Sequence, residues 1–259
     1  MYKIIANWKM YLSIRDSREL AAKLVKWWKE TPCVNVDVVL CPSDIAMRDV
    51  ADQVLTSGIK LGGQSLSLSA GLGAFTGQSA AQQLQEAGAE YVILGHSEQR
   101  RFLGVTDRMV RQQVQVAMQH RLHPIVCVGE TEEERKSGRA DAVVVSQLHA
   151  IFEQLSWPTT GLSVAYEPVW AIGSGKPVDP KEAQRMHVLI KYTLQEFFGS
   201  VRAQDTSVLY GGSVNPDNMG SFLQEKAVSG LLVGSASTNP DTLHALITGI
   251  QNDFCKRPL

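Results

Sequence analysis

Short apolar runs alternate with longer amphipathic segments along the whole chain, and this alternation constrains the fold more than any other feature. The apolar runs are rich in Val, Ile and Leu and show little polar alternation. That pattern is typical of parallel strands buried on both faces and covered by helices. We expect strands over residues 3–6, 36–40, 59–62, 91–94, 124–128, 163–166, 207–210 and 230–233.

The segments between these runs carry the spacing of helices. In the segment 106–120, Val110, Val114 and Met118 fall on one helical face. Thr131 and Glu134 form a capping-box pattern that opens another helix. Further helices are expected over residues 17–29, 43–55, 79–87, 141–154, 181–198, 216–224 and 241–250.

Roughly eight strand–helix pairs in a chain of 259 residues match the size of a closed (β/α)8 barrel, an α/β fold. No interdomain linker or low-complexity tract interrupts the pattern, so we expect a single barrel domain over residues 1–259. A doubly wound open sheet is the main alternative. It usually has fewer units and an early glycine fingerprint, which this chain lacks.

The charge and the cysteines limit the partners and the compartment. A formal net charge of −1 with no basic block argues against nucleic acid and anionic membranes as partners. No apolar run approaches the ~20 residues that span a bilayer, and the first residues lack the organisation of a signal peptide. The cysteines form no CxxC pair and fit buried, reduced positions, which predicts a cytoplasmic protein. They are Cys33, Cys41, Cys127 and Cys255.

Polar or glycine residues follow nearly every expected strand. In a (β/α)8 barrel the carboxyl ends of the strands form one rim, and function lies there. Any single residue could be ordinary turn chemistry, but their convergence on one rim predicts a site. The residues are Asn7, Lys9, Gln64, His96, Glu98, Glu130, Glu167, Gly211, Gly212, Ser213, Gly234 and Ser235.

Glu167 is the strongest candidate for a catalytic base. It follows an apolar strand directly, and the loop behind it has two glycines between Pro168 and Pro177. Proline stiffens the ends of such a loop and glycine permits unusual backbone angles in its middle, as a mobile lid requires. Taken alone, the pattern also fits a solvated glutamate that opens a loop.

The other rim residues suit an anionic substrate. Glycine-rich turns after the last two strands, with a short helix after Ser235, would offer N–H groups to a phosphate, although Gly211 and Gly212 also fit a plain tight turn. His96 is at the rim, whereas the other five histidines fall in helices or at helix ends. Lys9 is either a surface lysine or a cation at the mouth of the site. Glu98 is either the partner of Lys9 or a residue that orients the side chains that contact the substrate. No cluster has metal-ligand spacing, so no metal is expected.

Several motifs, in order along essentially the whole chain, resemble the triosephosphate isomerase family. They are Asn7-Trp8-Lys9-Met10, Gly73-Ala74-Phe75-Thr76-Gly77, Gly95-His96-Ser97-Glu98, Ala165-Tyr166-Glu167-Pro168-Val169-Trp170-Ala171-Ile172-Gly173 and Tyr210-Gly211-Gly212-Ser213-Val214. The resemblance implies a TIM barrel that interconverts dihydroxyacetone phosphate and D-glyceraldehyde 3-phosphate without a cofactor.

The resemblance also implies roles for single residues. A carboxylate base, a neutral histidine and a closing loop are the known mechanism of this family, which would make Glu167 the base and His96 the electrophile. Lys9 and Asn7 would hold the substrate and stabilise the enediolate. The resemblance further implies that backbone N–H groups bind the phosphate at Gly173, Ser213, Gly234 and Ser235. Tyr210 and Ser213 would latch the lid, and Glu98 and Glu130 would support the site. Phe75 and Thr76 would belong to a loop at the dimer contact.

The chain departs from the family pattern at five positions. Tyr11 and Ser65 replace asparagines, Gln78 and Val105 replace glutamates, and Gln99 replaces an arginine. In the family, positions 78, 99 and 105 belong to a charge cluster at the dimer contact. Because all three charges are absent together, no lone buried charge remains, whose cost would be several kcal/mol. We therefore expect a homodimer with an altered contact.

Other functions stay open at this point. A paralogue acting on a related sugar phosphate, such as a tetrulose phosphate, would use the same residues. A non-catalytic barrel that binds phosphorylated metabolites would not need Lys9, His96 and Glu167 together. A barrel lyase would normally need a Schiff-base lysine inside a strand or a metal, and the sequence shows neither signature.

Overall fold

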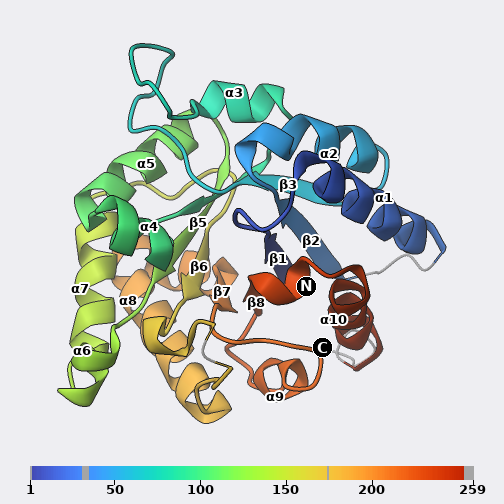
Figure 1. Cartoon of the computed structure of the whole chain (residues 1–259). Coiled ribbons are helices and arrows are strands. Elements are labelled where there is room, and N and C mark those ends of the chain that lie inside the picture. Colours follow the sequence, from blue (N-terminus) through green and yellow to red (C-terminus); the bar gives the residue numbers. More distant parts are fainter. Residues whose placement is uncertain (1, 31–34, 174, 254–259) are drawn as a thin grey trace.

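Eight parallel strands close into a barrel in which each strand pairs with the next along the chain and β8 pairs with β1 (Figure 1). The structure is a computed structural model that describes residues 2–30, 35–173 and 175–253. The strands are β1 Tyr2–Asn7, β2 Val36–Cys41, β3 Lys60–Gly63, β4 Tyr91–Leu94, β5 His123–Val128, β6 Ser163–Tyr166, β7 Ser207–Tyr210 and β8 Gly230–Val233. The predicted (β/α)8 barrel is confirmed, and each predicted strand is found within one residue at either end.

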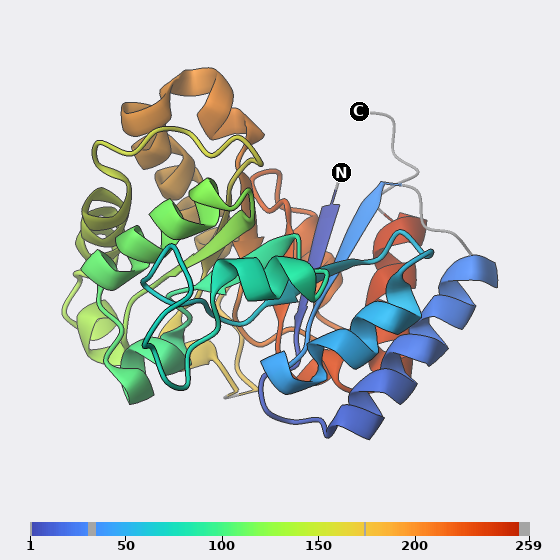
Figure 2. The ribbon, with the colours of Figure 1, turned by 90° about the horizontal axis from the view of Figure 1, so that it is seen from above.

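The helices form an outer layer around the strands, as the turned view also shows (Figure 2). The α-helices are α1 Ile14–Glu30, α2 Met47–Val54, α3 Ala81–Glu86, α4 Ser97–Leu103, α5 Asp107–Gln119, α6 Glu132–Lys136, α7 Ala140–Phe152, α8 Pro180–Asp205, α9 Met219–Leu223 and α10 Pro240–Asp253. The described residues also form the short 3-10 helices η1 Asp44–Ala46, η2 Val169–Ala171 and η3 Ser235–Ser237. Among the described residues, no helix is long and apolar enough to cross a membrane.

Two layers of apolar side chains make the core. The larger cluster fills the space between strands and helices. A smaller one fills the barrel interior, where Ile5, Ile93 and Leu209 are completely buried. Cys41 and Cys127 belong to this interior cluster and are unpaired thiols, as predicted. Cys33 and Cys255 lie outside the described residues.

The helices differ most from the prediction in four places, apart from shifts of up to three residues at the ends of others such as α1 and α10. The segment 43–55 is divided into η1 and α2. The segment 181–198 continues to Asp205, with Gly199 at φ 79° where two helices meet. The segment 216–224 keeps only α9, because the Asn215 and Asn218 side chains bind backbone N–H groups ahead of the helix.

The fourth difference is α4, which the sequence did not predict. His96 caps its start by accepting a hydrogen bond from the Glu98 backbone, and Gly104 ends it at φ 66°. This short helix lies at the carboxyl end of β4, so it brings its first residues to the rim. The predicted capping box is confirmed, with Thr131 and Glu134 at the start of α6. At the start of α5 the Thr106 side chain accepts a hydrogen bond from the Met109 backbone, a cap that was not predicted.

Candidate active site

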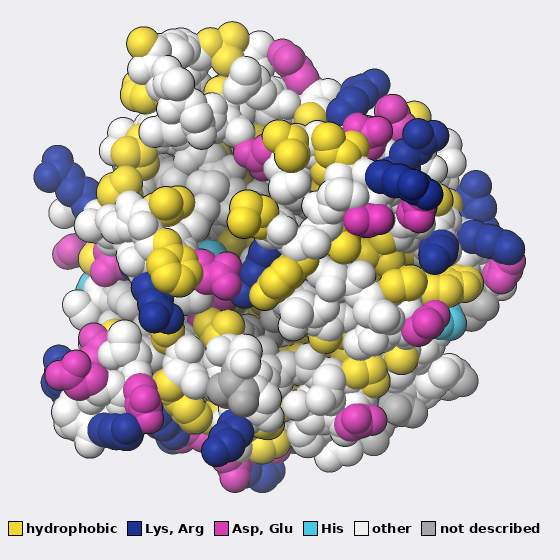
Figure 3. All heavy atoms as spheres, in the orientation of Figure 1, with side chains coloured by type: hydrophobic (Ala, Val, Ile, Leu, Met, Phe, Trp, Pro, Cys, Tyr) yellow, Lys and Arg dark blue, Asp and Glu magenta, His cyan; other side chains and the backbone are white. Residues whose placement is uncertain are grey.

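A cavity of about 550 Å³ opens at the carboxyl ends of the strands, within the usual range for small-molecule sites. The space-filling view shows a hollow in the middle of this face, where a histidine and charged side chains of both signs gather (Figure 3). Most of the predicted rim residues line the cavity. They are Asn7, Lys9, His96, Glu98, Glu167, Gly173, Gly211, Gly212, Ser213, Gly234 and Ser235, whereas Gln64 and Glu130 do not line it.

Glu167 is held at the tip of β6 with its carboxylate almost fully buried. Its backbone N–H donates to the Val128 carbonyl at 2.8 Å, which ties it to the end of β5. The two carboxylate oxygens have separate partners: Oε2 accepts from the Ser97 backbone N–H at 2.9 Å, and Oε1 lies 3.1 Å from Nε2 of His96. The base candidate and the imidazole are therefore in direct contact.

The hydrogen bonds of His96 indicate which ring nitrogen carries the proton. Nδ1 accepts a hydrogen bond from the Glu98 backbone N–H at 3.2 Å, so it presents a lone pair. In the neutral ring the proton is then on Nε2, which points at Glu167. His96 can therefore donate a hydrogen bond into the cavity.

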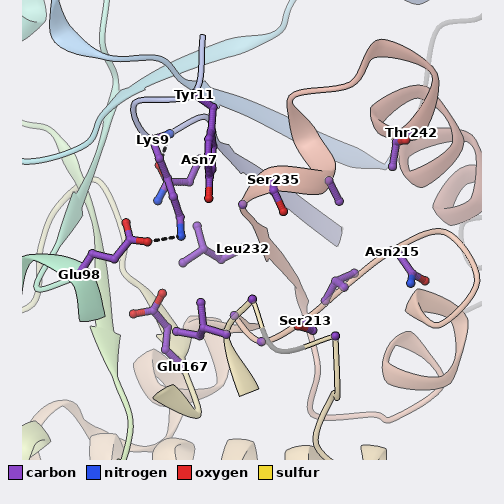
Figure 4. Close-up of a pocket in the computed structure, with 18 of the residues that line it drawn as sticks. Asn7, Lys9, Tyr11, Glu98, Glu167, Ser213, Asn215, Leu232, Ser235 and Thr242 are labelled. Carbon is purple, nitrogen blue, oxygen red and sulfur yellow. Dashed lines mark hydrogen bonds and ion pairs between the residues drawn. The ribbon is translucent and has the colours of Figure 1, made fainter. Parts of the chain in front are cut away.

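Lys9 reaches across the cavity wall to the same group of side chains (Figure 4). Its Nζ is 2.7 Å from Oε1 of Glu98, which confirms these two residues as partners. Its backbone has φ 48°, a conformation that few residues other than glycine adopt, and its N–H donates to the Asn7 side chain at 3.0 Å. The ammonium is thus fixed at Glu98, whose other carboxylate oxygen lies 3.7 Å from Nδ1 of His96.

Backbone turns line the other side of the cavity. Ser213 and Ser235 face it from the ends of β7 and β8, and η3 begins at Ser235 (Figure 4). Gly212 must be glycine, because a Cβ there would lie 2.2 Å from the Tyr210 hydroxyl oxygen. The Ser213 hydroxyl donates to the Ala171 carbonyl at 2.8 Å, which links this wall to the segment after Glu167.

The segment after Glu167 is anchored at both ends and has permissive glycines between. At its start, Glu130 is fully buried and accepts from the Trp170 indole N–H at 2.9 Å and from the Tyr166 hydroxyl. At its end, the Val178 N–H donates to the Tyr210 hydroxyl at 3.1 Å. Gly173 and Gly175 have φ 65° and 70°, and Ser174 lies outside the described residues.

Buried hydroxyl and thiol groups beneath the site stay protonated. Burial raises the pKa of Tyr210 to about 12. Burial and the neighbouring Glu130 carboxylate raise the pKa of Tyr166. Burial, followed by the Glu167 carboxylate, raises the pKa of Cys127. These groups therefore act as neutral hydrogen-bonding partners at neutral pH.

Sequence reasoning assigned no role to three residues that shape the site. The Ser97 backbone N–H binds the Glu167 carboxylate, and it was hidden because the helix α4 was not predicted. Trp170 and Val178 anchor the two ends of the segment after Glu167. The two prolines that flank this segment were the only available signal for its ends.

A carboxylate in contact with an imidazole, beside an ammonium group and at the carboxyl end of a (β/α)8 barrel, defines an enzyme that works by acid–base chemistry. The chain matches the triosephosphate isomerase family model over residues 2–250. The chain belongs to the triosephosphate isomerase family, as its motifs indicated.

Relatives in this family match the chain over nearly its full length. The triosephosphate isomerase of Symbiobacterium thermophilum is 40% identical over 244 residues, which cover 94% of each chain. That of Roseiflexus sp. is 38% identical over 245 residues, 94% of this chain and 95% of the relative. That of Aquifex aeolicus is 34% identical over 244 residues, 94% of this chain and 97% of the relative.

Proposed function

We propose that the chain interconverts dihydroxyacetone phosphate and D-glyceraldehyde 3-phosphate through an enediolate. The observation that carries this proposal is the contact between Glu167 Oε1 and His96 Nε2, 3.1 Å apart, with the Lys9 ammonium beside them. The reaction moves a proton between neighbouring carbons, and one carboxylate can remove and return it. The family, and the names of the relatives, support the choice of substrate.

In this mechanism the three side chains divide the work. Glu167 takes the proton from the carbon next to the carbonyl. His96 donates a hydrogen bond from Nε2 to the carbonyl oxygen as negative charge develops there, which is the role of an oxyanion donor. It then gives this proton to that oxygen and takes the hydroxyl proton from the neighbouring oxygen, so that the ring ends neutral. Lys9 supplies positive charge to the enediolate and Asn7 helps to hold the substrate.

The phosphate binds on the opposite side of the cavity. Its ligands are backbone N–H groups at Gly173, Ser213, Gly234 and Ser235. Such groups suit a phosphate because they donate hydrogen bonds and do not transfer protons to it. The proton transfer then takes place at the other end of the substrate, beside Glu167. This division explains why charged side chains gather on one side of the cavity and backbone turns on the other.

The segment after Glu167 acts as a lid over the enediolate. An enediolate phosphate exposed to water eliminates its phosphate, so the site must exclude water during the reaction. Ser213 holds the start of the lid and Tyr210 holds its end. Glu130 fixes the position of Trp170 by accepting a hydrogen bond from its indole. Gly173 and Gly175 supply the backbone freedom that closure requires.

A coupled assay separates this proposal from its rivals. We expect turnover of glyceraldehyde 3-phosphate, with kcat/KM for a tetrose or tetrulose phosphate lower by about 10- to 200-fold, the usual discrimination for one carbon. Equal or faster turnover of the tetrose substrate would identify the paralogue. Binding of 2-phosphoglycolate, an enediolate mimic, without any turnover would identify a binding barrel.

We also propose that the chain forms a homodimer through the rim loops beside the site. Apolar side chains are exposed in the segments that follow the first four strands, among them Met10 at 92%, Ile45 at 78% and Phe102 at 67%. Exposed apolar groups gathered in this way commonly mark an interface. The protruding loop that carries Phe75 and Thr76 lies between β3 and α3 (Figure 1).

The protruding loop is held by its own subunit before any partner binds. Gln113 and Gln112 of α5 donate to the carbonyls of Leu66 and Leu68 at 2.7 and 2.9 Å. His120, just after α5, contacts the carbonyl of Ala70 at 2.6 Å. With neutral residues at positions 78, 99 and 105, we expect light scattering to show a dimer at micromolar concentration that changes little with salt. A fully active monomer would contradict this.

Finally, we place the protein in the cytoplasm. Cys41 and Cys127 are free thiols inside the barrel, and burial raises the pKa of Cys41 so that it stays protonated. Reduced, buried cysteines suit a reducing compartment. Fractionation of cells that produce the protein would test the assignment, and recovery outside the cytoplasm would refute it.

A further inference from the structure

Lys9 is restrained by two consecutive residues of α4, one at each end of the lysine. Glu98 holds the ammonium at 2.7 Å. Gln99 acts from further away: its amide Nε2 donates to the Gln64 backbone carbonyl at 3.2 Å. The Gln64 side-chain amide in turn donates to the Lys9 carbonyl at 2.8 Å.

Gln64 connects the ends of two strands as well as reaching Lys9. The same Nε2 that binds the Lys9 carbonyl also donates to the Cys41 carbonyl at 3.0 Å, so both of its hydrogens are used. Cys41 is the last residue of β2, and Lys9 follows β1 by two residues. A displacement of Gln64 therefore changes the position of Lys9 relative to the barrel.

The backbone of Lys9 needs such restraint. Its φ of 48° is unfavourable for a residue with a side chain and persists only where neighbouring contacts enforce it. The residues that follow give little packing, since Met10 is 92% exposed and Tyr11 is 60% exposed. The restraints come instead from Asn7 on the Lys9 N–H and from Gln64 on the Lys9 carbonyl.

Gln99 makes this contact through only one end of its side-chain amide. Within the described part of the chain, its Oε1 is buried and has no hydrogen-bond partner. An unsatisfied buried acceptor destabilises a fold, whereas an apolar side chain of similar size would not. A residue that served only to stabilise the fold at this position would not need the amide.

We propose that Gln99 is a positioning residue for the reaction, acting through Gln64 to set the position of Lys9. The inference rests on the proposed function, because Lys9 is assigned there to the enediolate. Family members usually carry an arginine at position 99. In this chain the residue at that position would act within one subunit, through a hydrogen bond that needs no charge. The relay runs from α4 to the loop after β1 without crossing to a second chain.

The Gln99→Leu variant tests the proposal, because leucine keeps the volume and removes both the donor and the unsatisfied acceptor. We expect kcat/KM to fall between about 5- and 50-fold, as for a displacement of Lys9 by less than 1 Å. Both KM and the Kd for 2-phosphoglycolate, measured by calorimetry, should rise. The melting temperature should change little, because the variant removes the unpaired Oε1 of Gln99 but also takes the Gln99 donor away from the Gln64 carbonyl.

A matched control and a double variant make the result specific. Gln85 of α3 also donates its amide to a backbone carbonyl, that of His120, but near the amino ends of the strands. Gln85→Leu should leave KM and the Kd for 2-phosphoglycolate unchanged. In a Gln64→Leu background, Gln99→Leu should cause no further loss, because the relay is already broken.

Three results would overturn the proposal. The first is wild-type KM and Kd in Gln99→Leu. The second is a lower melting temperature with reduced kcat at unchanged KM and Kd, which would show a structural role. The third is recovery of activity at higher protein concentration, which would show an effect on assembly. Failure of the proposed function gives a different result, namely a wild-type protein without isomerase activity, and the calorimetric Kd still tests the relay.

Discussion

Gly129 offers the sharpest test of how the fold positions Glu167. It follows β5 directly, and a Cβ added to it would lie 1.8 Å from the Glu167 carbonyl oxygen and 2.5 Å from the carbonyl carbon. Ordinary contact begins at 3.4 Å, so Gly129→Ala requires the two backbones to separate by about 1.6 Å. Neither partner is a flexible side chain that could turn away.

Most of this separation must come from a displacement of the tip of β6, where Glu167 lies. Gly129 is held from its other side, because the Gln147 side chain binds both its N–H at 2.9 Å and its carbonyl at 3.1 Å. A misplacement of 1 Å can cost about 100-fold in rate, so we expect kcat/KM to fall by about 100-fold or more. Overpacking of this kind costs about 1–3 kcal/mol of stability.

The measurement compares Gly129→Ala with Gly220→Ala in the coupled assay and in thermal unfolding. Gly220 lies in α9, and no described atom lies within 4 Å of a Cβ built there. Gly220→Ala should keep wild-type activity and gain about 0.5–1 kcal/mol from helix propensity. If Gly129→Ala retains wild-type kcat/KM and stability, the close approach of β5 and β6 does not position the base.

Three further predictions address other parts of the molecule. Burial lowers the pKa of His123 to about 4, so the folded protein keeps this ring neutral while the unfolded chain takes up a proton near pH 6.5; stability is therefore lost as the pH falls below 6.5. Between pH 7 and pH 5, urea unfolding should show that the free energy of unfolding falls by about 2 kcal/mol less in His123→Gln than in the wild type. An equal fall in both proteins would refute the burial effect. Tyr210→Phe removes the acceptor for the Val178 N–H and should lower kcat by up to about tenfold in the coupled assay, whereas normal kcat would argue against a latch. Deletion of residues 172–175 should increase the share of substrate lost as free phosphate, and an unchanged share would count against the lid.

The sequence predicted the parts of the structure that depend on local pattern. The strands are mostly apolar because most of their residues are buried on both faces of the sheet, so each was located within one residue. The convergence of Lys9, His96 and Glu167 on one cavity follows from closure of the barrel, which brings all carboxyl ends to one rim.

Other features depend on contacts between distant segments and could not be predicted. The seven residues of α4 are mostly polar, and its limits are set by the His96 cap and by Gly104. The relay from Gln99 to Gln64 joins residues 35 positions apart, and the anchor between Val178 and Tyr210 joins residues 32 apart. No local spacing records such contacts, because they form only after the barrel has closed.

The assignment of Glu167 as the base is tested most directly by isomerisation in D₂O, followed by NMR, for the wild type and Glu167→Gln. A carboxylate that removes and returns the proton exchanges part of it with solvent, so the wild-type product should carry deuterium on the carbon that receives the proton. Glu167→Gln should lose at least about 100-fold in turnover while still binding 2-phosphoglycolate. Near-normal turnover in Glu167→Gln would contradict the assignment.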